Sequence, residues 1–189
     1  RGKSVVSETM FEGVALTQTK KQVLDYWRSL IVGTSLTSGT DEADIPLFGD
    51  FDILELSLCM PNLVLFEVRA DPRDFYYRLI GSNVDQHNTD AFTGSVMSEL
   101  SGKGPGSKVW DFFSSVIDTG APAIREMPYV GRNKDFERIE IMALPLRGDA
   151  ARNDHILVGT DSFPSEAGGP SAPGRGKGTD RNPASTGAR

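Results

Sequence analysis

The sequence predicts a single α+β domain built on an antiparallel sheet of five strands. Three observations support this prediction: two neighbouring strand-forming segments, three more segments later in the chain, and one long amphipathic helix between the two groups. Within each group the links are short and rich in turn residues, which favours hairpins over the helical crossovers that parallel strands need. A chain of 189 residues has room for one such domain with appended segments.

The first element is an amphipathic helix over residues 19–31. Its apolar side consists of residues at helical spacing: Val23, Leu24, Trp27, Leu30 and Ile31. Its charged residues lie elsewhere on the helix: Lys20, Lys21, Asp25 and Arg28. The following residues, 35–52, are turn-rich and acidic, and Pro46 blocks a regular helix there. We expect a surface connection with room for one helical turn.

The strands are predicted from β-branched, aromatic and other apolar residues between turn residues. The first two cover residues 63–69 and 75–80, joined through Asp71-Pro72. The last three cover residues 123–130, 136–146 and 155–163, with turns at 131–134 and 148–154 between them. Both groups therefore read as consecutive antiparallel hairpins.

The helical middle of the chain separates the two groups of strands. The polar residues 82–90 lead into short helical turns that contain Phe92, Val96, Met97 and Leu100. A longer helix then begins after Ser107, which can cap its first turn, and ends at Gly120. Its apolar residues recur at helical spacing: Val109, Phe112, Phe113, Val116 and Ile117.

Charge and cysteine content exclude several classes of protein. The formal net charge is −6, and residues 164–189 contribute four basic and two acidic residues, so the part before them carries −8. Such a surface repels nucleic acid. Cys59 is the single cysteine, which excludes an intramolecular disulfide and a zinc site of several thiolates. Because the sequence also lacks an apolar run of about 20 residues and an export signal, we expect a cytoplasmic protein without membrane insertion.

The chain divides into three parts. Residues 1–18 have no clear periodicity and stay unassigned. Residues 19–163 form the predicted domain. Residues 164–189 are rich in glycine, proline and serine and contain no large apolar residue, so we expect a disordered tail.

Four short motifs within the domain occur in a characteristic order. They are Asp25-Tyr26-Trp27-Arg28, the strand Phe75-Tyr76-Tyr77-Arg78-Leu79-Ile80-Gly81-Ser82, Thr93-Gly94 before Met97-Ser98-Glu99-Leu100, and Phe136-Glu137-Arg138 running to Leu144-Pro145-Leu146. On these motifs, residues 23–163 resemble the stand-alone PAS domain proteins of alphaproteobacteria. The sequence departs from that pattern at residues 36–52, where an acidic segment replaces a basic, proline-flanked one.

The resemblance implies a PAS fold with the strand order 2-1-5-4-3, helices on one face and an N-terminal amphipathic helix. It also implies a non-enzymatic sensor or regulator in bacterial signal transduction, which acts through contacts with other signalling proteins and can bind a small ligand. A homodimer through the helix at residues 23–31 is expected, because Tyr26 and Trp27 would otherwise leave apolar surface in water.

The predicted ligand pocket is lined by side chains from the helices and strands that enclose a PAS cavity. They are Tyr77, Phe92, Trp110, Phe112, Phe113 and Arg138. Ordinary core packing is the more frequent use of such aromatic residues and stays an alternative to the pocket. Arg138 and Arg78 can lie on the solvent face and pair with Glu137 or Glu140, while a buried Arg138 would bind an anionic ligand.

The sequence gives little support for a flavin or haem cofactor. Flavin photochemistry of the LOV type is excluded because the Asn-Cys-Arg motif is absent, and Cys59 is expected to be a buried, inert thiol. Haem needs an axial histidine, but His87 lies in a polar loop and His155 is expected at the surface. Asp85, His87 and Asp90 could hold a metal, although capping preferences alone produce such a loop. No Gly-x-Ser-x-Gly motif supports a hydrolase.

The alternative is a small enzyme or ligand carrier of the cone-shaped NTF2-like kind, with an acid-base Asp or His in its pocket. Those chains place most helices before a long curved sheet. Here the longest central helix lies between the second and third strands, which favours the PAS order.

Overall fold

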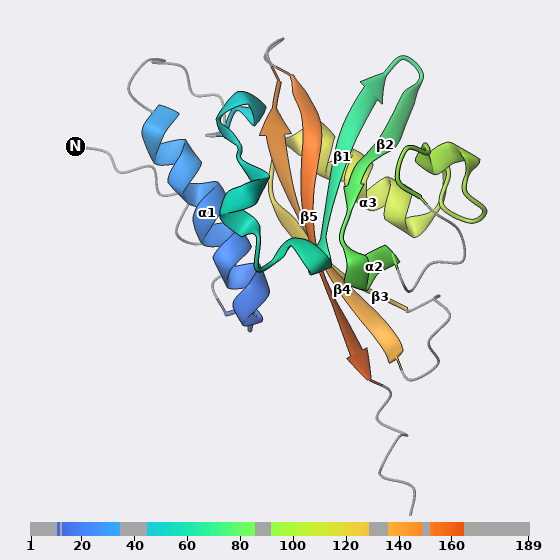
Figure 1. Ribbon diagram of the computed structural model, residues 1–189. Coiled ribbons are helices and arrows are strands. Elements are labelled where there is room, and N and C mark those ends of the chain that lie inside the picture. The colour runs from blue at the N-terminus through green and yellow to red at the C-terminus, as the bar shows by residue number, and fades with distance from the viewer. Residues whose placement is uncertain are drawn as a thin grey trace, which may run out of the picture.

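The structure is a computed structural model that describes residues 11, 13–34, 45–85, 92–128, 136–148 and 152–164. The predicted N-terminal segment lies mostly outside the described residues, and so does the predicted tail after residue 164. The described part of the chain forms one sheet with helices packed on both of its faces (Figure 1).

The sheet has five strands in the order β2-β1-β5-β4-β3, and every neighbouring pair is antiparallel. The strands are β1 Leu63–Ala70, β2 Arg73–Ile80, β3 Ala123–Pro128, β4 Phe136–Arg147 and β5 Asn153–Pro164. The predicted strand order is confirmed, and the predicted strand limits differ from the observed ones by a few residues. The NTF2-like alternative is wrong at the level of fold.

Seven helical segments accompany the sheet in the described part of the chain. The α-helices are α1 Gln18–Thr34, α2 Ser82–Asp85 and α3 Lys108–Thr119. The 3-10 turns are η2 Phe48–Asp50, η3 Ile53–Leu56, η4 Met60–Asn62 and η5 Met97–Glu99. The limits of α3 follow from local chemistry, since the Ser107 side chain accepts a hydrogen bond from the Trp110 amide and Gly120 adopts a left-handed conformation with φ 66°.

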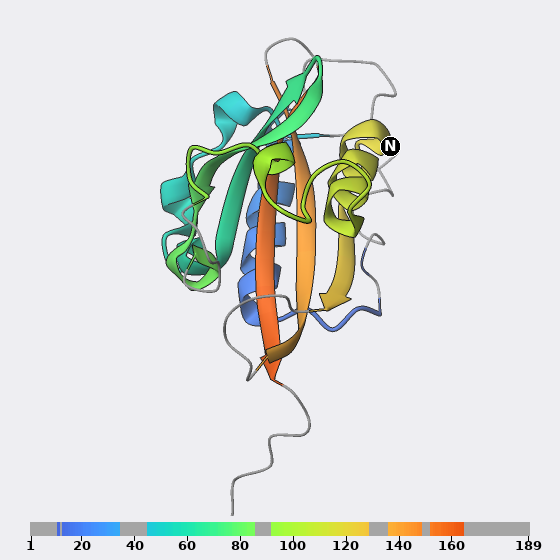
Figure 2. The same cartoon turned by 90° about the vertical axis from the view of Figure 1, so that its right-hand side faces the viewer.

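Two hydrophobic clusters lie on opposite faces of the sheet. The α3 layer, with α2 and η5, covers the face that carries Ile141 and Ala143 of β4. The α1 layer, with η2 to η4, covers the face that carries Met142 and Leu144. Successive residues of a strand point to opposite faces, and all four residues are buried, so β4 is shared by both clusters. In Figure 2 the view is onto the sheet, and α1 lies behind the strands.

The apolar side of α1 packs against the chain's own sheet. Trp27 is buried, and its indole Nε1 donates a 2.8 Å hydrogen bond to the Pro145 carbonyl. Tyr26 is half-buried, and its hydroxyl accepts a 2.8 Å hydrogen bond from the Asp52 amide. The expectation that Trp27 leaves apolar surface in water is therefore wrong, because the sheet and the segment after α1 cover that side. The homodimer stays a prediction without this support.

Residues 45–62 connect α1 to the first strand across the face of the sheet. Residues 35–44 of the predicted surface connection lie outside the described part, but Leu47 pairs with Arg147 and η2 supplies the predicted helical turn. The turns η3 and η4 follow directly and bury Leu56 and Cys59 against the α1 layer. This connection is thus part of the packed structure and not a loose surface loop.

Candidate functional site

The five aromatic residues predicted to line a pocket meet in the α3 layer, and all five are buried. Their rings contact one another and the phenylalanines of the strands. The shortest centroid distances are 4.5 Å for Phe66–Tyr77, 5.0 Å for Phe75–Trp110, 5.0 Å for Phe66–Phe113, 5.5 Å for Tyr77–Phe92 and 5.6 Å for Phe112–Phe113. Ring pairs at these separations stabilise a core beyond the area that they bury.

Polar groups on the elements of this layer include the Tyr77 phenol and the Ser114 hydroxyl. Burial raises the pKa of the Tyr77 phenol well above its usual value, so the hydroxyl stays protonated at physiological pH. The Ser114 hydroxyl on α3 is buried without a hydrogen-bond partner among the described residues. Sequence reasoning missed Ser114, because a serine within an amphipathic helix gives no signal of burial.

Arg138 lies apart from the aromatic cluster. Its side chain is half-exposed and forms a 2.6 Å ion pair with Glu126, while its guanidinium lies 4.8 Å from the Phe163 ring centre. Arg78 likewise pairs with Glu67 at 2.7 Å. The solvent-face position predicted for both arginines is observed. The predicted partner Glu140 bonds elsewhere, so the choice of partner was wrong for that residue.

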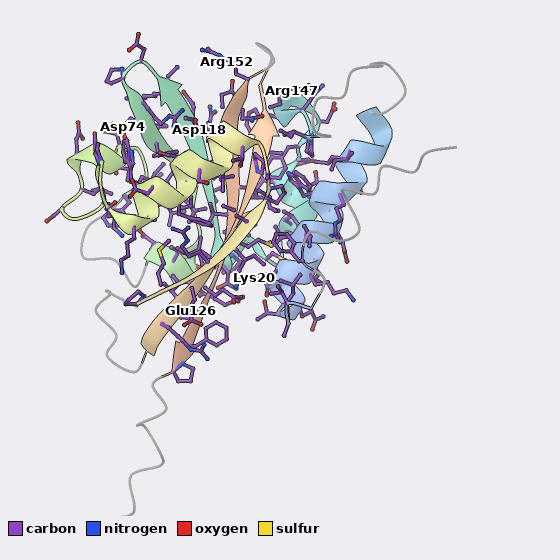
Figure 3. All side chains as sticks on the ribbon, turned by 180° about the vertical axis from the view of Figure 1, so that it is seen from behind. Lys20, Asp74, Asp118, Glu126, Arg147 and Arg152 are labelled. Atoms are coloured by element: carbon purple, nitrogen blue, oxygen red, sulfur yellow. The ribbon has the colours of Figure 1, made fainter. Side chains whose placement is uncertain are left out.

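A buried ion-pair network fixes the start of α1 to the sheet. The Lys20 side chain is 0% exposed, and its Nζ lies 2.6 Å from Glu140 and 2.9 Å from Asp161. The Thr17 hydroxyl donates a 2.7 Å hydrogen bond to Asp161. Lys20 was expected on the polar side of its helix, and that expectation is wrong. Its stem lies over Gly159, where a missing side chain leaves room, and Figure 3 labels Lys20 between α1 and the sheet.

His155 is buried under η2, contrary to the expected surface position. Its ring stacks on Phe48 with a centroid distance of 3.7 Å and an interplanar angle of 3°, and its Nδ1 lies 2.6 Å from Asp154. Its Nε2 is buried without a hydrogen-bond partner among the described residues. The sequence could not show this, because Phe48 lies more than 100 positions before His155 in the chain.

The predicted metal and haem candidates are only partly described. His87 and Asp90 lie outside the described residues, and Asp85 ends α2. Within the described ranges, no group of three or more His, Cys, Asp or Glu side chains is arranged to hold a metal ion. Likewise, no helix in these ranges has the length and apolar character needed to span a membrane.

Cys59 is a buried thiol, as predicted, and it lies in the α1 layer. Its Sγ lies 3.2 Å from the Gln22 side-chain oxygen, to which it donates a hydrogen bond. Burial raises the pKa of the Cys59 thiol above its usual value, which lowers the fraction of reactive thiolate. Because Cys59 belongs to the α1 layer, its sulfur lies on the opposite side of the sheet from the aromatic cluster.

We expect a thiol reagent to label Cys59 slowly in the folded protein. At pH 8 the rate should be on the order of 100-fold lower than in the urea-unfolded chain, since the thiol is covered and mostly protonated. The matched control is Leu58→Cys in a Cys59→Ser background, because position 58 is exposed. Equal rates for the folded and unfolded chain would contradict the buried position.

Two carboxylates link the turn of the β1–β2 hairpin to the α3 layer: Asp118 on α3 and Asp74 at the start of β2. Asp118 on α3 accepts two hydrogen bonds from the Arg73 guanidinium, at 2.6 and 3.0 Å. Asp74 accepts hydrogen bonds from the amide and the hydroxyl of Ser98, which lines a surface hollow together with residues 99–102 and 104–107. Figure 3 labels both carboxylates beside α3 and the neighbouring loop.

The Arg73–Asp118 pair gives a testable pH dependence. The hydrogen bond from Arg73 lowers the pKa of Asp118 below its usual value. A carboxylate with a depressed folded-state pKa stabilises the fold above its unfolded pKa, near 3.9, and this contribution is lost as pH falls through the folded pKa. Both side chains are half-exposed, so the contribution is at most about 1 kcal/mol. The difference in the free energy of unfolding between wild type and Asp118→Asn, measured by urea denaturation, should narrow as the pH falls from about 5 to about 2. A difference that stays constant over this range would refute the linkage.

Comparison with known proteins adds little at the level of sequence. No family model and no curated protein matches the chain. Among solved structures, the chain is similar to a sensory box sensor histidine kinase from Vibrio cholerae, with 10% sequence identity and a TM-score of 0.44. The match covers 60% of this chain and 91% of that one. The strand order carries the assignment instead. The fold is of the PAS type.

Proposed function

We propose that this PAS-type protein is a sensory or regulatory module of bacterial signal transduction. In this proposal it acts in the cytoplasm through contacts with other signalling proteins and catalyses no reaction. The observation that carries the proposal is the sharing of β4 between two hydrophobic clusters. A shift of Ile141 and Ala143 under α3 moves a strand whose alternate residues, Met142 and Leu144, support α1.

Contacts between the sequence motifs support membership in the stand-alone PAS proteins. Trp27, from the first motif, donates its hydrogen bond to Pro145 of the last motif. Tyr77, from the second motif, accepts a 2.9 Å hydrogen bond from the Gly94 amide and donates a 3.0 Å bond to the Ser95 carbonyl. Motifs far apart in sequence thus meet in pairs, which is expected when one fold maintains all of them.

Native mass spectrometry and an absorption spectrum of the freshly purified protein test the ligand part of the proposal. A retained mass, or an absorption band at longer wavelength than that of the aromatic residues, would show that the protein binds a small ligand. A colourless protein of the bare chain mass would leave protein contacts as the mode of action.

Hydrogen exchange of α1 tests the sensory route itself. Val116→Ala removes two buried methyl groups from the α3 layer, and we expect it to accelerate amide exchange in α1 more than in β1. The control is Ser115→Ala on the exposed side of the same helix. If the α1 and β1 amides accelerate equally, the effect is global destabilisation and the proposed route is wrong.

A further inference from the structure

We propose that the segment between α1 and β1 carries a docking surface for a basic, amphipathic segment of a partner protein. This inference rests on the proposed function, since it names the chemistry of the partner. The surface, called here the acidic leucine face, consists of Leu54 and Leu58 with Asp50, Asp52 and Glu55. Figure 1 shows the segment beside α1, on the face of the sheet opposite α3.

The two leucines are exceptionally exposed. Leu54 is 68% exposed and Leu58 is 89% exposed. Among the described residues, the third exposed large apolar side chain is Val14, at 44%. The segment between α1 and β1 thus exposes two large apolar side chains within five residues. Such concentrations on a water-facing surface mark interaction sites more often than scattered single residues do.

The backbone holds these leucines outward. Leu56 and Cys59, from the same segment, are buried in the α1 layer, so the segment is anchored on its inner side. The Asp52 carboxylate caps the Leu54 amide at 2.9 Å, and the Ser57 amide donates a 3.1 Å bond to the Leu54 carbonyl. These bonds fix the backbone at Leu54. A partner therefore meets a surface that is already organised, which lowers the entropy cost of binding.

The charge around the leucines identifies the kind of partner. Asp50, Asp52 and Glu55 are all exposed, and residues 29–68 contain seven acidic residues and no lysine or arginine. A second copy of this chain would bring like charges together at the same surface. An anionic membrane surface would be repelled in the same way. A helix that presents apolar residues flanked by lysine or arginine complements both the leucines and the carboxylates.

The test uses the full chain and a defined probe. The probe is a fluorescent synthetic peptide of leucine and lysine at amphipathic helical spacing. Two matched peptides separate the contributions, one with serine for leucine and one with glutamate for lysine. We expect the wild-type chain to bind the first peptide at least about tenfold more tightly than either control, with affinity falling as salt rises.

Variants of the chain locate the binding. The double variant Leu54→Ser/Leu58→Ser and the variant Glu55→Lys should each weaken binding by about tenfold or more, which corresponds to about 1.4 kcal/mol. Val14→Ser and Glu99→Lys are the controls, because they change exposed residues outside the face. The changed side chains are exposed, so all variants should fold, and their unfolding midpoints verify it.

Three results of the peptide experiment would overturn the inference. The wild-type chain could fail to bind the leucine-lysine peptide, the leucine variant could bind it as tightly as wild type, or Glu55→Lys could bind it as tightly as the control variants. A concentration-dependent dimer that disappears in the leucine variant would assign the face to a second copy and also overturn it. The hydrogen-exchange test of α1 is independent of these outcomes. The inference can therefore fail while the proposed sensory route stands, and the reverse also holds.

Discussion

Replacing Lys20 by methionine is expected to lower the free energy of unfolding by about 3 to 5 kcal/mol. The ammonium is fully buried between Glu140 and Asp161, which lie directly opposite each other on β4 and β5. Without it, two carboxylates face each other at the base of α1 with no cation between them, and like charges in that position are destabilising. Methionine keeps most of the stem volume, so the loss reports on charge and not on packing.

Urea denaturation of three variants checks this result. Lys21→Met removes the neighbouring, exposed lysine and should change stability by less than about 0.5 kcal/mol. The triple variant Lys20→Met/Glu140→Gln/Asp161→Asn removes all three charges and should recover part of the loss. If Lys20→Met alone loses less than about 1 kcal/mol, the network does not hold α1 on the sheet in the manner described.

Replacing Phe113 by alanine is expected to cost about 3 to 5 kcal/mol. The ring is buried in the α3 layer, with centroids 5.0 Å from Phe66, 5.6 Å from Phe112 and 5.8 Å from Phe75. Alanine leaves a cavity that these neighbouring rings, packed against α3 and the sheet, can fill only partly. Thermal or urea unfolding measures the loss directly.

Phe113→Leu is the matched control, since it keeps an apolar side chain of intermediate volume and should lose clearly less stability. Native mass spectrometry of both variants connects this prediction to the predicted pocket. If Phe113→Ala were as stable as wild type and bound a ligand that wild type lacks, the ring would be a plug of a binding site and not part of a required core.

Local sequence signals predicted much of the fold. Ser107 and Gly120 mark the limits of α3 because capping depends on neighbouring residues alone. The hairpin of β1 and β2 likewise follows from two adjacent strand-forming runs with a proline-containing turn between them. The five aromatic residues proposed as a pocket lining do meet in the α3 layer, because the elements that carry them were recognised from sequence patterns. Their role in holding a ligand stays a prediction.

The buried polar residues could not be predicted in this way. Lys20 follows helical periodicity onto a charged side, and only the register of β4 against β5 brings Glu140 and Asp161 beneath it. His155 is covered by Phe48 from a connection whose path across the sheet is set by tertiary packing. Local patterns report which residues favour water on average, whereas these two positions depend on partners more than 100 residues away.

The hydrogen bond from Trp27 to Pro145 also bears on aggregation. β3 pairs with β4 only as far as Ala143, so beyond this residue the side of β4 is flanked by residues 46–47 of the connection and not by a neighbouring strand. Proline has no N–H to donate there, its carbonyl is already engaged by the indole, and the next available amide, from Arg147, is bonded to the Pro46 carbonyl at 2.9 Å. A strand from another molecule would find no free N–H at Pro145 or Arg147, and the Pro145 carbonyl already accepts one hydrogen bond. The contact that holds α1 in place thus also closes a sheet edge to intermolecular pairing.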